Sequence, residues 1–177
     1  MLTLRNLRWP DDHDALLAID TSFTTQRVHR VVTTGTVFSI QDATVSPPLY
    51  KVYDLTRDIE EIVAMDHVVI AEQELRVVGL AALMHDTEDE RAIIRHIYVH
   101  RPYRGQGVGR ALMNAMVTQA EHWRARCMWL ETQDVNYDAI DFYQHNGFQW
   151  CGLDLSLDEH DGSPTNETAV FFMRNLK

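Results

Sequence analysis

The chain has 177 residues, of which 45% are hydrophobic and 24% charged, a composition typical of one globular domain spanning residues 1–177. A net charge of −10 would repel a phosphate backbone, and no apolar run approaches the roughly 20 residues that span a bilayer, so we expect neither a nucleic-acid nor a membrane partner. The N-terminus lacks a signal-peptide pattern and the two cysteines are too few for a disulfide framework or zinc site, which favours a cytoplasmic protein without a metal.

The N-terminal third predicts an edge strand, a helix and further strands. The edge strand is expected at residues 2–7, and Asp11 or Asp12 is suited to cap the helix that follows. Residues 22–30 are mostly polar and fit either a second short helix or a loop. Residues 31–53 are rich in β-branched and aromatic side chains and predict one or two strands with a loop between them.

The middle of the chain predicts a run of strands that leads into one long helix. Residues 58–62 fit a short acidic helical turn or a loop, and strands are expected at residues 67–71 and 76–85. A charged hairpin tip at residues 86–91 then leads into a strand at residues 93–99. The later elements are a helix from residue 107 to 123, a buried strand at 127–130, a helix at 136–146, and strands at 148–157 and 167–173 around a polar loop at 158–166.

The turn Arg104-Gly105-Gln106-Gly107-Val108-Gly109-Arg110 connects the strand at 93–99 to the long helix. Glycines at alternate positions allow the backbone to curl tightly and to approach a ligand without Cβ atoms in the way. Several N–H groups would then converge beside a helix N-terminus, which favours binding of a phosphate or diphosphate. The simpler alternative is a tight turn between a strand and a helix.

Three segments in order resemble the GNAT superfamily of N-acetyltransferases. Residues 104–109 resemble its Arg/Gln-x-x-Gly-x-Gly/Ala motif, residues 97–103 the strand end and loop before that motif, and residues 142–148 its F-Y-x-x-x-G-F element. Rossmann and P-loop spacings are both missing here. The resemblance implies an α/β (α+β) fold, with a mixed, mostly antiparallel sheet of about seven strands, splayed central strands and about four flanking helices.

The resemblance also implies that acetyl-CoA is the co-substrate and that its diphosphate lies on the glycine turn. The pantetheine arm would pair with backbone groups freed by a bulge in the central strand, one of which would hold the oxyanion of a tetrahedral intermediate, an effect of about 3–4 kcal/mol in comparable sites. The implied acetyl-CoA contacts are Ile97, Tyr98, Val99, Arg104, Gly105, Gln106, Gly107, Val108, Gly109, Arg110, Asn136 and Tyr143.

Attack by an amine with a pKa of about 10 first requires loss of a proton. Many relatives place a Glu on the central strand for this purpose, but this chain has Arg95 and His96 there. The remaining candidates are His96, Glu131 and Asp134, of which we favour Glu131, acting directly or through water. His96 also fits a structural histidine, and Asp134 also fits a helix cap. Tyr143 matches the family's phenolic acid, which would protonate the leaving thiolate.

Residues 130–136, with the element at 142–148, are similar to streptothricin acetyltransferases, which acetylate an amine on a cationic antibiotic. The resemblance therefore implies direct acetyl transfer to a primary amine of a small-molecule acceptor, streptothricin-like or polyamine-like, and it also allows a homodimer. Two other functions stay open, namely a protein or peptide N-acetyltransferase and a non-catalytic acyl-CoA-binding module. Acidic side chains suited to a cationic acceptor are Glu60, Glu61, Glu131 and Asp134.

Overall fold

The computed structural model describes residues 1–156 and 167–177, which form two compact units. The first unit comprises Met1–Phe23, Val52–Trp129 and Asn175–Lys177, and the second comprises Thr24–Lys51 and Leu130–Arg174. The α-helices of the described residues are α1 (His13–Leu17), α2 (Leu55–Ala64), α3 (Val108–His122) and α4 (Tyr137–His145). The strands are β1 (Leu2–Asn6), β2 (Phe23–Thr34), β3 (Val37–Lys51), β4 (His67–Gln73), β5 (Arg76–Asp86), β6 (Arg91–Val99), β7 (Cys127–Gln133), β8 (Gln149–Asp154) and β9 (Ala169–Asn175).

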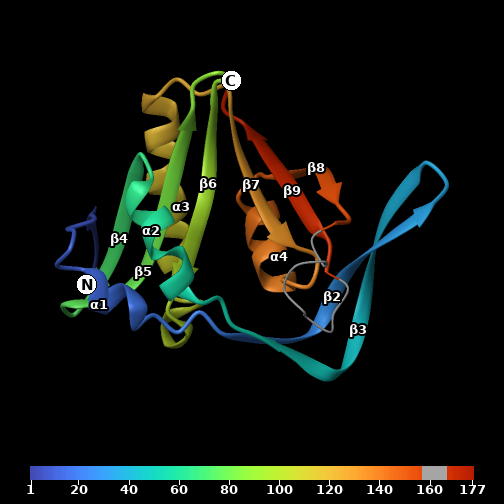
Figure 1. The fold of residues 1–177 in the computed structure, drawn as a ribbon, viewed down its shortest axis with the longest axis horizontal. Helices are drawn as coiled ribbons and strands as arrows, with labels where there is room; N and C mark the ends of the chain where they lie inside the picture. The colour runs from blue at the N-terminus through green and yellow to red at the C-terminus, as the bar shows by residue number, and fades with distance from the viewer. Residues whose placement is uncertain (157–166) are drawn as a thin grey trace. The chain divides into compact units, whose positions relative to one another are not determined.

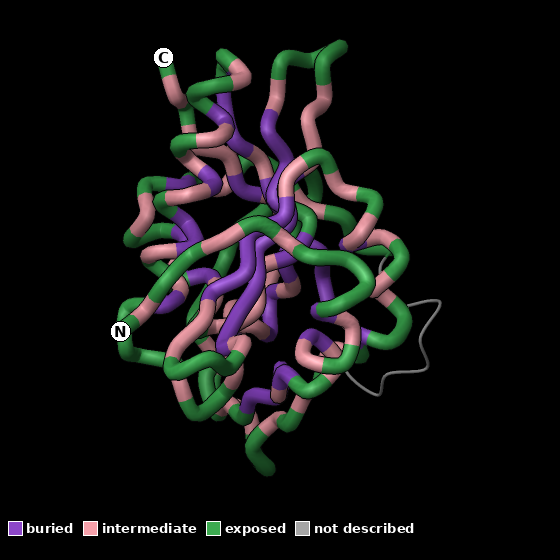
Figure 2. Tube along the Cα trace, turned by 90° about the vertical axis from the view of Figure 1, so that its left-hand side faces the viewer, coloured by how far each residue is buried: buried purple, intermediate pink, exposed green. Residues whose placement is uncertain are grey.

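The first unit is built on antiparallel strands in the order β1-β4-β5-β6, with helices on both faces. Successive residues of a strand face opposite sides of its sheet, so Leu80 and Ala82 of β5 join a buried cluster with Leu16 of α1 and Ile62 of α2, whereas Gly79 faces α3. Figure 1 shows α2 in front of these strands and α3 behind them. The strands are therefore covered on both sides, and Figure 2 shows buried residues along them.

A β-bulge interrupts the pairing of β6 with β5. Ala82 is paired with His96 and the next residue, Leu83, with Ile94, so that Arg95 is an extra residue on β6. Residues 92–94 before the bulge are buried, whereas residues 97–99 after it are only half-buried. The bulge implied by the family resemblance is therefore present in this strand.

Gly79 fixes the end of β6 against β5. It is paired with Val99, and a Cβ at this position would lie 2.7 Å from the carbonyl oxygen of Tyr98 and 3.2 Å from Cδ1 of Leu112 in α3. Real Cβ atoms do not approach a carbonyl oxygen so closely, so only glycine permits this packing. The backbone at the end of β6 is thereby held in place.

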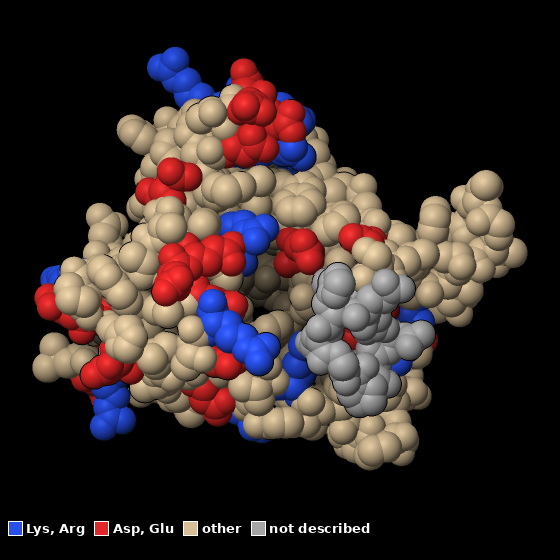
Figure 3. All heavy atoms as spheres, viewed as in Figure 1, with Lys and Arg blue, Asp and Glu red and all other residues tan. Residues whose placement is uncertain are grey.

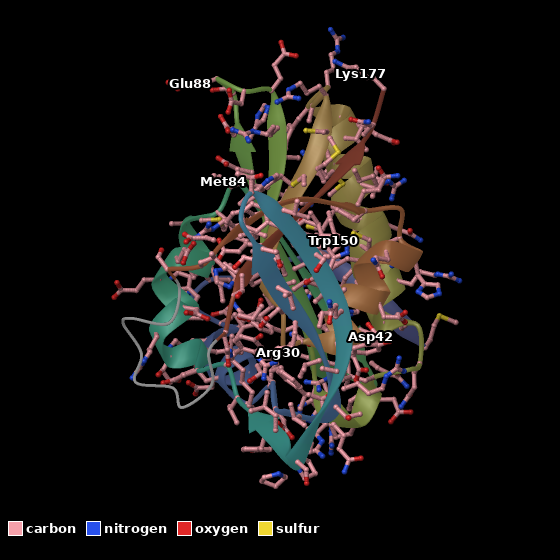
Figure 4. The ribbon with its side chains drawn as sticks, turned by 90° about the vertical axis from the view of Figure 1, so that its right-hand side faces the viewer. Arg30, Asp42, Met84, Glu88, Trp150 and Lys177 are labelled. Carbon is pink, nitrogen blue, oxygen red and sulfur yellow. The ribbon has the colours of Figure 1, made fainter. Side chains whose placement is uncertain are left out.

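The second unit contains a long hairpin and a further set of strands. β2 and β3 form a two-stranded sheet, and Figure 4 shows Arg30 on β2 and Asp42 on β3. The remaining strands follow the order β7-β9-β8, with β8 antiparallel to β9. On α4, the ring of Tyr143 packs against Phe148 and Phe172, with ring centroids 6.1 and 6.2 Å away.

The fold class is the predicted one, with seven strands in mostly antiparallel pairing in addition to the β2-β3 hairpin, and four α-helices among the described residues. One local prediction is wrong. Residues 22–30 belong mainly to β2, because a polar segment with a long pairing partner forms a strand. Residues 58–62 are helical, the first of the two predicted alternatives, but they are the middle of the ten-residue helix α2 and not a short turn. The predicted loop at 158–166 lies outside the described residues.

Asp12 is the N-cap residue of α1, as one of the two predicted positions, but its side chain does not cap the helix. The side chain instead accepts two 2.7 Å hydrogen bonds from the guanidinium of Arg5 and one from the N–H of Arg8. Arg5 also donates to Glu72 at 2.6 Å.

Figure 3 shows acidic and basic side chains next to one another over much of the face in view. No helix in the described part of the chain is long and apolar enough to cross a membrane.

Candidate active site

The turn between β6 and α3 presents the start of a helix to open space. Gly105 and Gly107 have φ angles of +73° and +85°, and apart from the adjoining residues no atom of residues 1–156 and 167–177 lies within 4 Å of a Cβ built at either residue. The N–H of Ala111 donates to the carbonyl of Gly107 at 3.0 Å, which is the first hydrogen bond of α3, so the N–H groups of residues 108–110 have no partner within the helix. Gly109 lies in the first turn of α3. Left-handed backbone therefore occurs at two of the three glycines of this turn, Gly105 and Gly107.

The polar side chains of this turn hold its shape. Arg104 donates from Nη1 to the carbonyl of Ser22 at 2.6 Å and from Nε to the carbonyl of Val99 at 3.0 Å. Gln106 donates from Nε2 to the carbonyl of Pro102 at 2.9 Å. Both side chains were predicted to contact acetyl-CoA, and the contacts found here show them bracing the strand end and the loop.

Directly before the strand end, His96 lies between two carboxylates of α2. Its side chain is 8% exposed, and its Nε2 and Nδ1 atoms lie 3.6 Å from Oε2 of Glu61 and 4.0 Å from Oδ2 of Asp58. Neither ring nitrogen has a hydrogen-bond partner among the described residues. Burial lowers the pKa of His96 below its usual value, although the two carboxylates oppose this shift.

The neighbours of His96 complete a charged and aromatic cluster. Arg95 donates from Nε to Oε1 of Glu61 at 2.8 Å, and the hydroxyl of Tyr98 lies 3.4 Å from Oδ2 of Asp58. Burial alone would raise the pKa of Glu61, but the hydrogen bond and charge of Arg95 outweigh it and lower that pKa. The cluster of Asp58, Glu61, His96 and Tyr98 is called the α2–β6 cluster below.

The other proposed bases lie in the second unit. Glu131 is exposed on β7. Asp134 is 1% exposed, and its Oδ1 accepts a hydrogen bond from the N–H of Thr168 at 3.2 Å, so its side chain binds Thr168 instead of serving as the predicted helix cap. Burial raises the pKa of Asp134. A buried carboxyl group tied to the backbone in this way fits a structural role.

The two remaining predicted residues belong to α4. Asn136 is its N-cap residue, and the carbonyl of Asn136 accepts a hydrogen bond from Ile140 at 3.0 Å. Tyr143 is 7% exposed and is held between Phe148 and Phe172. The first unit therefore brings together the glycine turn, residues 97–99 and His96, while Glu131, Asn136 and Tyr143 lie in the second unit.

Two features were missed by the sequence analysis. Asp58 was not assigned to the site, although its spacing from Glu61 places both on one face of a helix. The second unit also contains a pocket of about 420 Å³, beside which Arg27 stacks over the ring of Tyr137 at 4.1 Å. Its lining residues are Thr24, Thr25, Gln26, Arg27, Pro48, Tyr137 and Asp138.

The sequence and the fold of the chain were compared with those of known proteins. The model of the Acetyltransferase (GNAT) family matches residues 38–148. The streptothricin acetyltransferase of Streptomyces lavendulae is 34% identical over 155 residues, covering 84% of this chain and 82% of that protein. The crystal structure of nourseothricin acetyltransferase has a TM-score of 0.87 at 32% identity and covers 99% of both chains.

A third relative supports the same fold. A Bacillus anthracis protein assigned as a streptothricin acetyltransferase, and solved in complex with acetyl coenzyme A, has a TM-score of 0.83 at 24% identity over 99% of both chains. The family match spans more than half of the chain, and the relative from Streptomyces lavendulae covers most of it. The chain is therefore an acetyltransferase that belongs to the GNAT family, as its motifs predicted.

Proposed function

We propose that the chain transfers the acetyl group of acetyl-CoA to a primary amine of a small cationic acceptor of the streptothricin type. The observation that carries the proposal is the turn at Gly105 and Gly107, where left-handed glycines leave open space in front of the first N–H groups of α3. The similarity to a streptothricin acetyltransferase over 84% of the chain supports the choice of acceptor. The net charge of −10 favours a cationic acceptor over an anionic one.

The turn fits the diphosphate of acetyl-CoA. The N–H groups of residues 108–110 and the positive end of the helix dipole would bind the anionic oxygens, and the missing side chains at Gly105 and Gly107 would let those oxygens approach the backbone. Arg104 and Gln106 would contribute by holding the turn in shape. The half-buried residues 97–99 would then offer backbone groups to the pantetheine arm and to the thioester carbonyl.

In the proposed reaction, the neutral amine attacks the thioester carbonyl directly through a tetrahedral intermediate. A C–N bond forms and the C–S bond breaks. Tyr143 would donate its phenolic proton toward the leaving sulfur, and its packing against Phe148 and Phe172 would fix the orientation of its ring. Glu131, exposed on β7, would attract the cationic acceptor.

Release of free thiol from acetyl-CoA tests this function, with streptothricin, spermidine and a lysine-containing peptide as parallel acceptors. We expect turnover with streptothricin at a kcat/KM at least about 100-fold above that for the peptide, because the site is proposed to select a small cation. Preference for the peptide would identify a protein acetyltransferase instead. Binding of CoA without turnover of any amine would identify a non-catalytic module.

A further inference from the structure

His96 is a buried polar side chain whose two ring nitrogens both lack hydrogen-bond partners among the described residues. An imidazole that is 8% exposed would ordinarily be hydrogen-bonded, because leaving a buried donor or acceptor unpaired is unfavourable. Its strand partner Ala82 belongs to the core cluster beneath α2, so the ring of His96 lies on the same side of the sheet as α2. Both nitrogens therefore face the carboxylates of that helix.

His96 makes no hydrogen bond with either carboxylate of α2. The separations of 3.6 and 4.0 Å between the ring nitrogens and the carboxylates of Glu61 and Asp58 are longer than hydrogen bonds. An ammonium group has three N–H donors, so it can donate to a ring nitrogen of His96 and also to the carboxylates, which already accept hydrogen bonds from Arg95 and Tyr98. Two carboxylates and one neutral imidazole are a suitable acceptor set for such a cation.

Aromatic rings lie beside the same groups. The ring of Tyr98 lies 6.0 Å from that of His96, and the ring of Tyr53 lies 5.7 Å from that of Tyr98. Aromatic faces attract cations and also contact the methylene groups of an alkylamine. The α2–β6 cluster and Tyr53 therefore combine the chemistry that recognises the ammonium end of an aliphatic chain.

We infer that the α2–β6 cluster binds the ammonium group of the acceptor between Asp58 and Glu61 and that His96 removes its proton. This inference rests on the proposed function and assigns its acceptor subsite and its base. The sequence favours Glu131 as the base, but Glu131 is exposed, whereas His96 is buried with an acceptor nitrogen to which a bound ammonium would donate a hydrogen bond.

The ammonium nitrogen gives one proton to Nε2 of His96 and becomes a neutral amine, whose lone pair forms the C–N bond of the tetrahedral intermediate. The C–S bond breaks when that intermediate collapses. The amide nitrogen then loses a second proton, the sulfur gains one, and His96 returns its proton to water. One proton is therefore released for each acetyl group transferred. Asp58 and Glu61 stay ionised throughout and hold the cation before attack.

The inference predicts a particular pH profile. The groups that face His96 in the first unit are Asp58 and Glu61 from α2 and Arg95 and Tyr98 from β6, while its partner on β5, Ala82, does not titrate. Burial lowers the pKa of His96 below its usual value, so the neutral base form predominates at neutral pH. With an acceptor that binds as the ammonium ion, kcat/KM should be level from neutral pH until the amine itself deprotonates near pH 10.

The test compares His96→Gln with the wild-type enzyme by measuring kcat/KM for streptothricin at saturating acetyl-CoA. Glutamine keeps hydrogen bonding but cannot take up a proton, so we expect a loss of about 100-fold or more at pH 7. The variant must then use amine already deprotonated in solution, so its activity should rise about tenfold per pH unit toward pH 10. Acetyl-CoA affinity and melting temperature, measured on the same sample, report whether the variant is folded.

Glu61→Gln provides a second test at a half-exposed position that is less critical for folding. It should raise the KM for streptothricin about tenfold, the effect of losing one charged hydrogen bond, and change kcat by less than twofold. Glu121→Gln on α3 removes an equal charge from an exposed position and serves as the control, with no change in either constant.

The outcomes separate this inference from the proposed function. Wild-type turnover of streptothricin together with an unchanged rate and pH profile in His96→Gln would overturn the inference and leave the function intact. If no amine is turned over by the wild type, the ring resonances of His96, followed by NMR in the CoA complex, still decide the matter. Ring resonances that shift on addition of streptothricin or spermidine would support the subsite, and resonances that stay unchanged would overturn it.

Discussion

Gly107→Ala tests whether the glycine turn binds acetyl-CoA. The backbone of Gly107 has φ +85°, and beyond the adjoining residues no atom of the described chain lies within 4 Å of the added Cβ, so the substitution causes backbone strain without a steric clash among the described residues. This strain costs about 1–2 kcal/mol, which corresponds to a melting temperature lower by about 2–8 °C for a domain of this size. The new methyl group also occupies part of the open space at the turn, where the diphosphate is proposed to bind.

The expected effect on acetyl-CoA binding is larger than the effect on stability. Loss of one charge-assisted hydrogen bond costs about 1.5–3 kcal/mol, which weakens binding about 10- to 150-fold. Isothermal titration calorimetry with acetyl-CoA measures the affinity, and thermal unfolding measures the stability. Gly35→Ala is the matched control, because Gly35 has φ +60° with equally open surroundings but lies in the β2-β3 turn.

The control should lose a similar amount of stability and bind acetyl-CoA as tightly as the wild type. The reasoning would be refuted if Gly107→Ala bound acetyl-CoA within twofold of the wild-type affinity. It would also be refuted if Gly35→Ala weakened binding as much as Gly107→Ala, since strain alone would then explain the loss.

Three further predictions follow from individual contacts. Gly79→Ala places its Cβ 2.7 Å from the carbonyl oxygen of Tyr98, so the free energy of unfolding in urea should fall by about 1–3 kcal/mol, and an unchanged midpoint would contradict the packing. Hydrogen bonds from Arg5 lower the pKa of Asp12 from 3.8, so its carboxylate stabilises the fold above pH 3.8 and loses this effect as the pH falls through the lower folded-state pKa. Asp12→Asn should therefore cost about 2–4 kcal/mol at pH 7, and progressively less below pH 3.8 in acid unfolding curves. Tyr143→Phe should lower kcat about 100-fold in steady-state assays while the affinity for acetyl-CoA stays the same, and a wild-type kcat would exclude Tyr143 as the acid.

Elements with strong local signals were predictable from the sequence. The glycine turn and α3 were found because the glycines and the apolar helical face lie within one short segment. Residues 22–30 were missed because β2 alternates weakly and is stabilised by pairing with β3. Strand formation of this kind depends on a partner that local patterns do not reveal.

The candidate site was predictable only in part, for the same reason. The residues proposed to bind acetyl-CoA lie mostly in short motifs, whereas the neighbours of His96 come from an earlier helix and from pairing with β5. Asp12 shows the limit in another way, since its position before a helix suggested a cap but Arg5 on β1 binds its carboxylate. The roles of His96 and Asp12 depend on contacts between segments that are far apart in the sequence.

The most direct test of the account is a titration of ¹⁵N-labelled protein with CoA, followed through its backbone amide resonances. If the N–H groups of the turn bind the diphosphate, the largest shifts will fall on residues 105–110, and pantetheine, which has no phosphate, will leave these amides nearly unchanged. Tight binding of CoA with the amides of residues 105–110 unmoved would contradict the account.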